Sequence, residues 1–378
     1  MLASLRVLHV LRAPKGGVFR HVCDLVAGQA ERGLQVGVVS GVGLGEPATE
    51  AAFAELTPAC ALGIHRFPME RTLGWSDVGA VRGLAGVLRE VRADLVHGHG
   101  AKGAAYVRLT ASRAGAKAVY TPHGGSLHFS WRSPAGAAYL GLERLLRTRT
   151  DGLVFESEYA RRVFEEKIGA LRCARRVVHN GLRDEEFEPV GDGSHEYDFV
   201  FVGEIRRLKG IFVLLDALAQ LRPARTPSVL IVGSGPDEAQ LKSRIRDLEL
   251  WDSVTLSPPI HPARDAFALG RCTVVPSLAE SLPYVVLEAL AAGVPLLTTG
   301  VGGIPEIFGP HSDRLLPPGD ASALARAMGE VLSDVEAARA RARVLHDHVK
   351  RHLRVSQMVD AVVDFYGEVL DSRPRPDR

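Results

Sequence analysis

Residues 271–308, RCTVVPSLAESLPYVVLEALAAGVPLLTTGVGGIPEIF, decide the fold of this chain. An apolar strand at 272–275 leads through a polar turn at 276–281 into a helix at 283–292. Pro283 lies near the first turn of that helix and Gly293 just past its end, which are favoured positions for both residues. A second strand at 295–298, a glycine loop and a short helix opened by Pro305 follow. A strand, a helix and a second strand in this order predict a parallel sheet with crossover helices.

The helix at 283–292 is apolar on almost every side, so we expect it to be buried on most of its faces. It nevertheless carries one carboxylate, Glu288, and a second, Glu280, lies in the turn before it. A buried carboxylate without a partner is costly. Glu288 must therefore face either a cation or a solvated cleft, and such a site is a candidate for function.

Composition limits the class of protein. At 378 residues the chain suits two domains, and 46 Lys and Arg against 44 Asp and Glu do not suggest a nucleic-acid partner. The four cysteines are scattered, which indicates reduced thiols in a cytoplasmic protein and neither a disulfide framework nor a zinc site. No apolar run approaches the ~18 residues of a membrane span.

Short apolar runs alternate with helical stretches along the whole chain. The expected strands are at 7–11, 36–40, 95–97, 118–121, 153–155, 177–179, 199–202, 229–232, 254–256, 273–275, 296–298 and 314–316. The charged segment 183–198 is poor in aliphatic residues and is interpreted as an interdomain linker. The pattern predicts two doubly wound α/β domains in series, a last helix at about 355–370 and a polar tail at 372–378.

Ligands in open parallel sheets bind beyond the carboxyl ends of the strands. The first such loop contains Gly16 and Gly17, which can bring backbone N–H groups close to an anion at a helix N-terminus. A plain tight turn is the alternative. The loop at 203–210, after the strand at 199–202, places Arg206, Arg207 and Lys209 before a helix, which favours a phosphate cradle over a solvated basic loop.

Histidines follow two strands of the first half. His97 and His99 suggest a metal, but no third ligand is spaced nearby, so no metal site is expected. His123 precedes two glycines and can donate a hydrogen bond to a ligand hydroxyl, although a bond to local backbone is the alternative. The turn at Asn180 is interpreted as structural.

Together these motifs resemble the retaining nucleotide-sugar glycosyltransferases of family 4. The resemblance rests on Glu280 and Glu288 with seven residues between them, the GGIPEIF that follows, the glycine-to-lysine segment at 203–210, the His-Asn-Gly turn, the Thr-Pro-His-Gly loop and the Gly-Gly loop. It implies the GT-B fold, in which two Rossmann-like domains face each other across a cleft. The domains would span residues 1–185 and 186–353, with a helix and tail at 354–378 crossing back to the first domain.

The resemblance also implies roles for single residues. Glu280 would hold hydroxyls of the transferred sugar near the reacting centre, and Glu288 those of the ribose. The N–H groups of Ser281 and Leu282 would meet the sugar or diphosphate. The diphosphate would be contacted by Gly16, Gly17, Arg206 and Lys209. His123 would contact the donor sugar near the reacting centre. The family usually has arginine where this chain has Glu204, so Arg206 or Arg207 must supply that cation, and we favour Arg206.

The function implied is transfer of a hexosyl group from a UDP- or GDP-linked sugar to a hydroxyl of a saccharide or lipid-linked acceptor, without a metal or other cofactor. The segments PYVVLEALAAGVPLL and VGGIPEIFGP resemble those of bacterial enzymes of exopolysaccharide and lipid-linked saccharide assembly. A sugar-nucleotide epimerase and a non-catalytic sugar-nucleotide-binding module are the alternatives. Basic stretches at 102–117 and 144–149 could rest on the inner face of the cell membrane, but solvated helix faces are the favoured explanation of each.

Overall fold

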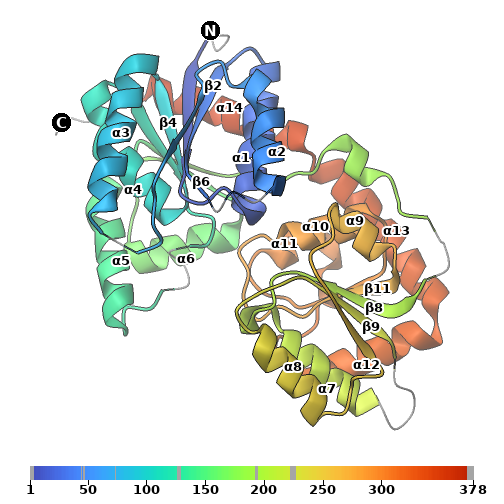
Figure 1. Cartoon of the computed structure of the whole chain (residues 1–378). Coiled ribbons are helices and arrows are strands. Elements are labelled where there is room, and N and C mark those ends of the chain that lie inside the picture. The colour runs from blue at the N-terminus through green and yellow to red at the C-terminus, as the bar shows by residue number, and fades with distance from the viewer. Residues whose placement is uncertain are drawn as a thin grey trace. The chain divides into compact units, whose positions relative to one another are not determined.

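The computed structural model describes residues 4–43, 45, 47–72, 74–125, 129–191, 195–221 and 227–372. The chain divides into two compact units, each drawn in Figure 1. The first unit is Met1–Asn180 with Val355–Arg378, and the second is Gly181–Arg354. The boundary expected after residue 185 falls within a short 3-10 helix, η5 (Asp184–Phe187). Most of the expected polar tail, residues 373–378, lies outside the described residues.

The described part of the first unit contains a seven-stranded parallel sheet in the order β3-β2-β1-β4-β5-β6-β7. Its strands are β1 (Arg6–Leu11), β2 (Gln35–Gly41), β3 (Ile64–Phe67), β4 (Leu95–His99), β5 (Lys117–Thr121), β6 (Gly152–Phe155) and β7 (Ala174–Val177). Its helices are α1 (Gly16–Glu31), α2 (Pro47–Leu56), α3 (Ser76–Val91), α4 (Gly100–Thr110), α5 (Pro134–Leu146), α6 (Glu158–Ile168) and α14 (Val355–Asp371).

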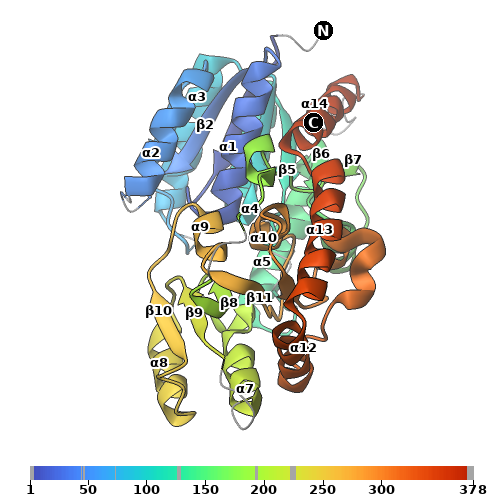
Figure 2. The same cartoon turned by 90° about the vertical axis from the view of Figure 1, so that its right-hand side faces the viewer.

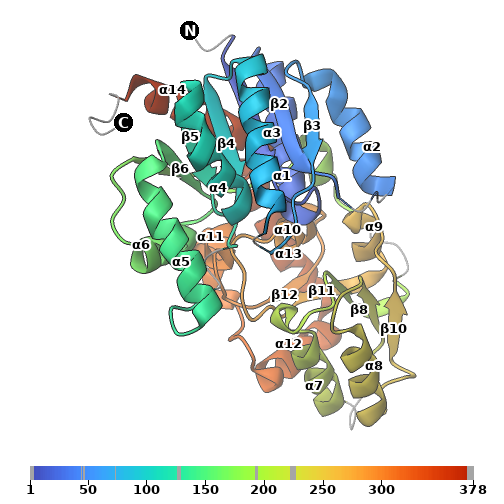
Figure 3. The ribbon, with the colours of Figure 1, turned by 60° about the vertical axis from the view of Figure 1, so that its left-hand side comes forward.

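Helices cover both faces of this sheet. Along β1, Val7 and Leu11 join a core with α1, α2 and α14, whereas Leu8 and Val10 join a core with α3 and α4. Figure 2 shows α1 and α14 on one face, and Figure 3 shows α3 and α4 on the other. Because successive side chains of a strand point to opposite faces, an almost wholly apolar strand is what a sheet covered on both sides requires.

Helix α14 belongs to the first unit although it follows the second in sequence. Its apolar residues Met358, Val362, Phe365 and Val369 are buried in the same core as α1. Tyr366 is buried with them, and its hydroxyl lies 2.6 Å from Nδ1 of His97 on β4. The helix therefore packs by apolar burial and also provides a polar partner inside the unit.

The described part of the second unit contains a five-stranded parallel sheet in the order β10-β9-β8-β11-β12. Its strands are β8 (Tyr197–Val202), β9 (Val229–Val232), β10 (Val254–Ser257), β11 (Gly270–Val275) and β12 (Leu296–Thr298). Its helices are α7 (Ile211–Leu221), α8 (Glu238–Asp247), α9 (Ala263–Phe267), α10 (Tyr284–Ala291), α11 (Ile304–Phe308), α12 (Ala321–Ser333) and α13 (Val335–His352).

Strand β8 divides the core of the second unit. Phe199 and Phe201 pack with α7, α8 and α12, and Val200 between them faces the opposite side. Helix α10 lies on that opposite side in a cluster that also contains residues of α11 and α13. The expected two α/β domains with parallel sheets are confirmed.

Three details of the strand prediction differ from the structure. The strand expected at 177–179 is β7 (Ala174–Val177), which overlaps the expected range only at Val177. The edge strand β3 was missed, because its IHRF sequence is only half-buried and carries no apolar run. The strand expected at 314–316 is absent from the described residues. Arg314 instead ends a 3-10 helix, η7 (Gly309–Arg314), and Leu316 makes an isolated bridge with Thr299. A single bridge satisfies the backbone there without a continuous ladder.

Candidate active site

The loops after β8 and β11 pack against each other at the carboxyl ends of these adjacent strands. Gly210 ends the 3-10 helix η6 (Arg207–Lys209) with φ +71°, and a Cβ on it would lie 1.7 Å from the carbonyl oxygen of Pro276. The N–H of Leu278 donates to the carbonyl of Leu208 at 2.8 Å. Glycine at position 210 is thus required both by its conformation and by the close approach of the second loop.

The loop after β12 closes on the same place. Thr299 Oγ1 donates to the carbonyl of Ser277 at 2.6 Å, and the N–H of Gly303 donates to the carbonyl of Ser281, also at 2.6 Å. Gly302 has φ +62°, and a Cβ on it would lie 2.1 Å from the carbonyl oxygen of Glu280. The loops after β8 and β12 therefore hold the turn at residues 276–281, which we call the carboxylate turn, in one conformation.

The carboxylate turn presents Glu280 to Lys209. Nζ of Lys209 lies 2.7 Å from Oε1 and 3.0 Å from Oε2 of Glu280, and Ser277 Oγ donates to Oε1 at 2.7 Å. Glu280 is 8% exposed as a residue, and the Lys209 side chain is 28% exposed. The pair is hydrogen-bonded and close to solvent, as two charges at a binding site need to be.

The other cations of this loop are more exposed. The Arg206 guanidinium lies 3.9 Å from the Glu204 carboxylate, and both side chains are about half exposed. Arg207 places its guanidinium 5.0 Å from the ring centroid of Phe212, while its N–H donates to Asp237. The structure therefore separates the two arginines: one stacks on α7, and the other is beside the carboxylate at position 204.

Helix α10 begins directly after the carboxylate turn. Pro283 is its N-cap residue in an extended conformation, which agrees with the expected start near residue 283. Leu282 is buried, whereas Ser281 and Glu288 are half-buried. The neighbours Leu287 and Ala289 are fully buried, so Glu288 occupies the part of the helix that the core does not cover.

In the first unit, the glycine loop opens helix α1. Gly16 has φ +62° with open space where a Cβ would point, and both Gly16 and Gly17 are exposed. Lys15 precedes them in an extended conformation. Exposed N–H groups at the start of a 16-residue helix have the geometry that anions favour.

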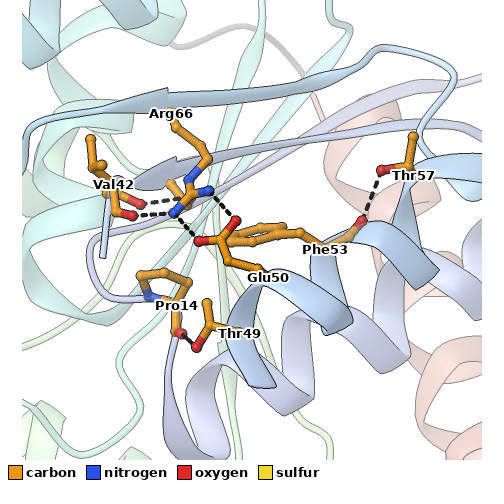
Figure 4. A network of polar contacts seen from close by, with 9 residues as sticks. Pro14, Val42, Thr49, Glu50, Phe53, Thr57 and Arg66 are labelled. Carbon is orange, nitrogen blue, oxygen red and sulfur yellow. Dashed lines mark hydrogen bonds and ion pairs between the residues drawn. The ribbon is translucent and has the colours of Figure 1, made fainter. Parts of the chain in front are cut away.

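A network from the neighbouring helix α2 supports this loop (Figure 4). Thr49 Oγ1 donates to the carbonyl of Pro14 at 3.2 Å. Helix α2 is itself held by Arg66, whose guanidinium bonds Glu50 through two nitrogens at 2.8 and 2.9 Å and also bonds the carbonyl of Val42. Hydrogen bonding to Arg66 holds the pKa of the exposed Glu50 below its usual value.

His123 follows β5 and adopts φ +50°, an uncommon conformation for a residue with a side chain. Nδ1 of its ring lies 2.6 Å from Oε1 of Glu156, and Nε2 lies 3.0 Å from Nδ1 of His99. Burial opposes ionisation of Glu156, but the positive charge and hydrogen bond of His123 outweigh it and lower the pKa of Glu156. Glu156 is therefore a buried carboxylate with a defined partner.

Four more histidine rings gather around this pair. Nε2 of His99 lies 3.0 Å from Nδ1 of His9, and the ring of His97 lies 4.2 Å from that of His99. Burial lowers the pKa of His9 to about 4 and that of His21 to about 3, and holds the pKa values of His97 and His99 well below 6.5. These four rings are thus neutral at pH 7.

Sequence reasoning singled out His123 and, separately, His97 and His99, but it missed the contact between His99 and His123 and the other members of the group. His9, His21, Glu156 and Asn180 lie on β1, on α1, directly after β6 and just before the second unit, so no spacing joins them. Asn180 was interpreted as a turn residue, yet its side chain is buried and contacts both His21 and Glu156. A usable signal was that β1, β4 and β5 are adjacent strands and that each contains or precedes a histidine.

The basic stretches considered for membrane contact are partly engaged inside the unit. Lys102 pairs with Asp77 at 2.7 Å, and Arg108 is buried against Glu143 at 2.8 Å. Among the described residues, no helix combines the length and apolarity that crossing a bilayer requires. Membrane contact stays a prediction.

Two family models match the chain one after the other. The model described as Glycosyltransferase Family 4 matches residues 15–186, and the model described as Glycosyl transferases group 1 matches residues 183–344. Their common border lies beside the border of the two structural units.

Curated relatives match part of the chain. TuaC of Bacillus subtilis, named for teichuronic acid biosynthesis, is 39% identical over 34% of this chain and 31% of its own. The D-inositol 3-phosphate glycosyltransferase of an Arthrobacter species is 36% identical over 42% of this chain and 40% of its own. The N-acetyl-alpha-D-glucosaminyl L-malate synthase of Bacillus anthracis is 27% identical over 48% of each. The chain thus spans about a third to a half of the length of these relatives.

Solved structures match nearly the whole chain. Anabaena HepE in complex with UDP has a TM-score of 0.79 at 17% identity, covering 96% of this chain and all of that one. The sucrose-phosphate synthase of Thermosynechococcus elongatus has a TM-score of 0.82 at 20% identity, covering 97% and 99%. The predicted GT-B fold is confirmed by these matches together with the two parallel-sheet units.

Proposed function

Since this chain is a member of glycosyltransferase family 4, we propose that it is a retaining glycosyltransferase of the hexosyltransferase class. It moves a sugar from a UDP- or GDP-linked donor to a hydroxyl of a saccharide or lipid-linked acceptor, in the cytoplasm and during assembly of a bacterial cell-surface polysaccharide. The part of TuaC that matches this chain supports the pathway, and HepE with bound UDP supports the donor class.

The observation that carries the proposal is the pair of Lys209 and Glu280. A lysine and a carboxylate 2.7 Å apart, at the carboxyl ends of adjacent parallel strands, offer opposite charges to the two ends of a sugar diphosphate. Lys209 neutralises the diphosphate, and Glu280 accepts hydrogen bonds from hydroxyls of the sugar. In the empty site the ion pair holds the two side chains in orientation and leaves no net charge. Donor binding loosens the bond between them.

The reaction needs no metal in this scheme. The acceptor oxygen attacks the anomeric carbon from the face on which the diphosphate leaves, and the carbon–oxygen bond to the diphosphate breaks. The acceptor proton passes to the departing phosphate oxygen, which keeps atoms and charge balanced. Catalysis then consists of positioning and of stabilising the leaving diphosphate with Lys209 and Arg206.

Other contacts complete the donor site. Glu288, half-buried on α10, accepts bonds from the ribose hydroxyls. The N–H groups of Ser281 and Leu282 meet the sugar or diphosphate, and those of Gly16 and Gly17 approach the diphosphate. Arg206 supplies the second cation because Arg207 is stacked on α7.

His123 contacts the donor sugar near the reacting centre. Both of its ring nitrogens have partners in the structure, Glu156 on Nδ1 and His99 on Nε2. Donor contact through Nε2 therefore requires the bond to His99 to open. Glu156 keeps the ring in place during that exchange, which makes it a positioning residue.

A screen of UDP- and GDP-linked sugars, with nucleotide release as the readout, tests the proposed function. Wild-type protein should release nucleotide slowly with one donor, and Glu288→Ala should lower that rate, whereas Glu238→Ala on exposed α8 should not. Retention is checked by the anomeric configuration of the product. No release with any donor, together with tight nucleotide binding, would indicate a binding module; isomerised donor without acceptor would indicate an epimerase.

A further inference from the structure

One ring nitrogen from each of His21, His99 and His123 lies within 4.8 Å of the other two. His21 is on α1, His99 ends β4, and His123 follows β5. We propose that these three residues, the histidine triad, bind one Zn²⁺ ion through their imidazole nitrogens and leave its fourth position open. Three histidines around an open position form a common zinc arrangement.

His21 has the clearest sign of a missing ligand. Its Nδ1 lies 3.0 Å from Oδ1 of Asn180, and the amide of Asn180 is oriented by donation from Nδ2 to Glu156 at 3.4 Å. Nδ1 of His21 is therefore the protonated nitrogen, and Nε2 carries a bare lone pair. That Nε2 is buried without a hydrogen-bond partner among the described residues, in a residue only 1% exposed. A buried acceptor left unpaired is costly, so a positively charged ligand is expected beside it.

The other two nitrogens face each other. Nδ1 of His99 and Nε2 of His123 are 3.0 Å apart and share one proton in the absence of a metal. Two ligands of a tetrahedral zinc ion, each at ~2.0–2.1 Å, are separated by about 3.4 Å, so small ring rotations suffice to admit the ion.

Each ring of the histidine triad is held from behind by a second partner. Glu156 holds His123, Asn180 holds His21, and His9 holds His99. Partners of this kind fix the tautomer and orientation of metal-binding imidazoles. Glu156 also places a negative charge next to the ligand set, which offsets part of the cost of burying a divalent cation.

A second group of rings, His9, His97 and His99, is a weaker candidate. Both nitrogens of His97 are occupied, by Tyr366 at 2.6 Å and Thr121 at 2.8 Å, and Gln29 bonds His9 at 2.9 Å. A metal there would have to break existing hydrogen bonds without gaining a carboxylate. The histidine triad is favoured because it supplies an unpartnered nitrogen and a neighbouring Glu156.

The site would oppose donor binding and would take no part in the chemistry. This consequence rests on the proposed function, because Nε2 of His123 is both a zinc ligand and the atom assigned to the donor sugar. Zinc at the histidine triad should therefore raise the KM for the donor. If zinc binds but leaves donor affinity unchanged, the donor role of His123 is wrong and the metal site stands.

The experiment uses the full chain with His348→Ala and His352→Ala as background, since these two rings on α13 lie 5.0 Å apart and form a separate place for adventitious metal. Co²⁺ is titrated in as a spectroscopic substitute for Zn²⁺, and Zn²⁺ is then used to displace it. We expect one equivalent of Co²⁺ to give the intense visible absorption of a tetrahedral nitrogen site, and Zn²⁺ to abolish it.

Variants locate the metal. His21→Ala should weaken Zn²⁺ binding by more than the ~10–100-fold that loss of an outer partner costs, and Glu156→Gln by about that factor. His65→Ala is the matched control, because His65 is a half-buried histidine of the same unit that bonds the carbonyl of Leu62. It should leave the affinity unchanged.

Two results would overturn the proposal. One is the absence of the tetrahedral Co²⁺ absorption in the background protein, and the other is the same absorption in folded His21→Ala. If His21→Ala does not fold, X-ray absorption at the zinc edge of the background protein decides the matter. Three imidazole nitrogens at about 2.0 Å support the histidine triad, and fewer than three contradict it.

Discussion

Two buried carboxylates, one in each unit, lie in loops that follow parallel strands. Glu280 follows β11 and is paired with a lysine that reaches solvent, whereas Glu156 follows β6 and is paired with a histidine inside a group of neutral rings. In the first arrangement the carboxylate is buried but its partner, Lys209, is 28% exposed and can reach a ligand. The second keeps its charge among protein groups, which suits positioning or metal binding more than direct contact with a diphosphate.

The largest effect is expected at Glu280. Glu280→Gln removes the charge that orients Lys209 and the acceptor for the sugar hydroxyls, so kcat should fall by ~10²–10³, the cost typical of losing one preorganised electrostatic contact. Initial-rate kinetics with the preferred donor measure this. Glu238→Gln, on exposed α8, is the control and should change kcat little.

The contribution of Lys209 and Glu280 to stability can be measured separately from their contribution to catalysis. Lys209→Met leaves the Glu280 carboxylate buried and unpaired, so the free energy of unfolding should drop by about 2–3 kcal/mol. The double variant Lys209→Met/Glu280→Gln should be more stable than Lys209→Met alone, although both are inactive. Urea unfolding of wild type, Lys209→Met, Glu280→Gln and the double variant provides a double-mutant cycle. Equal losses of unfolding free energy for Lys209→Met and the double variant would argue against the ion pair.

Acidification should lower the stability of the protein through its buried histidines. Burial lowers the pKa of His9 to about 4 from 6.5, so between these pH values the unfolded chain binds a proton that the folded chain does not. Stability is fully present above pH 6.5 and falls by about 3 kcal/mol for His9 as the pH approaches 4. Unfolding in the presence of a chelator should show a steeper loss for wild type than for His9→Gln.

Sequence reasoning predicted the region around Glu280 better than the region around Glu156, for a physical reason. Glu280, Glu288 and Pro283 lie in one short segment, so their spacing already fixes their relation to a helix start. Lys209 was found from its own loop, but its contact with Glu280 depends on Gly210 packing against Pro276, which links residues far apart in sequence. Those loop contacts could not be read from periodicity.

The histidine region was largely hidden from sequence reasoning. Its polar groups come from β1, α1, β4, the loops after β5 and β6, and α14, and each has apolar neighbours in sequence. A lone His9 or His21 is indistinguishable from a core residue until the strand order β1-β4-β5 brings the side chains together. The fold itself was predictable because alternating apolar strands and helices need no such long-range information.

A smaller effect is expected at Gly210, where the loop after β8 packs against the carboxylate turn. Gly210→Ala forces a left-handed conformation on a residue with a Cβ, which costs ~1–2 kcal/mol, and places that Cβ 1.7 Å from the carbonyl oxygen of Pro276. Thermal unfolding should show the loss, and donor affinity should fall with it. Gly79→Ala on α3, where a Cβ meets no atom within 4 Å, is the control.

The smallest effect is expected at Gly16. Its φ of +62° makes Gly16→Ala unfavourable by ~1–2 kcal/mol, but the open space around it predicts no clash. Relief of this strain would rotate the N–H groups at the start of α1, so the KM for the donor should rise several-fold with a small change in the melting temperature. A change in stability without any change in KM would remove this loop from the donor site.

The most direct test of the account is nucleotide release from UDP- and GDP-linked sugars by wild type, Lys209→Met and Lys242→Met. Lys242 is a matched lysine, exposed on α8 and paired with Glu238 at 2.6 Å. Wild type and Lys242→Met should release nucleotide from one donor, and the rate for Lys209→Met should be at least ~10²-fold lower. Equal rates for the two lysine variants would show that the pair of Lys209 and Glu280 is not the donor site.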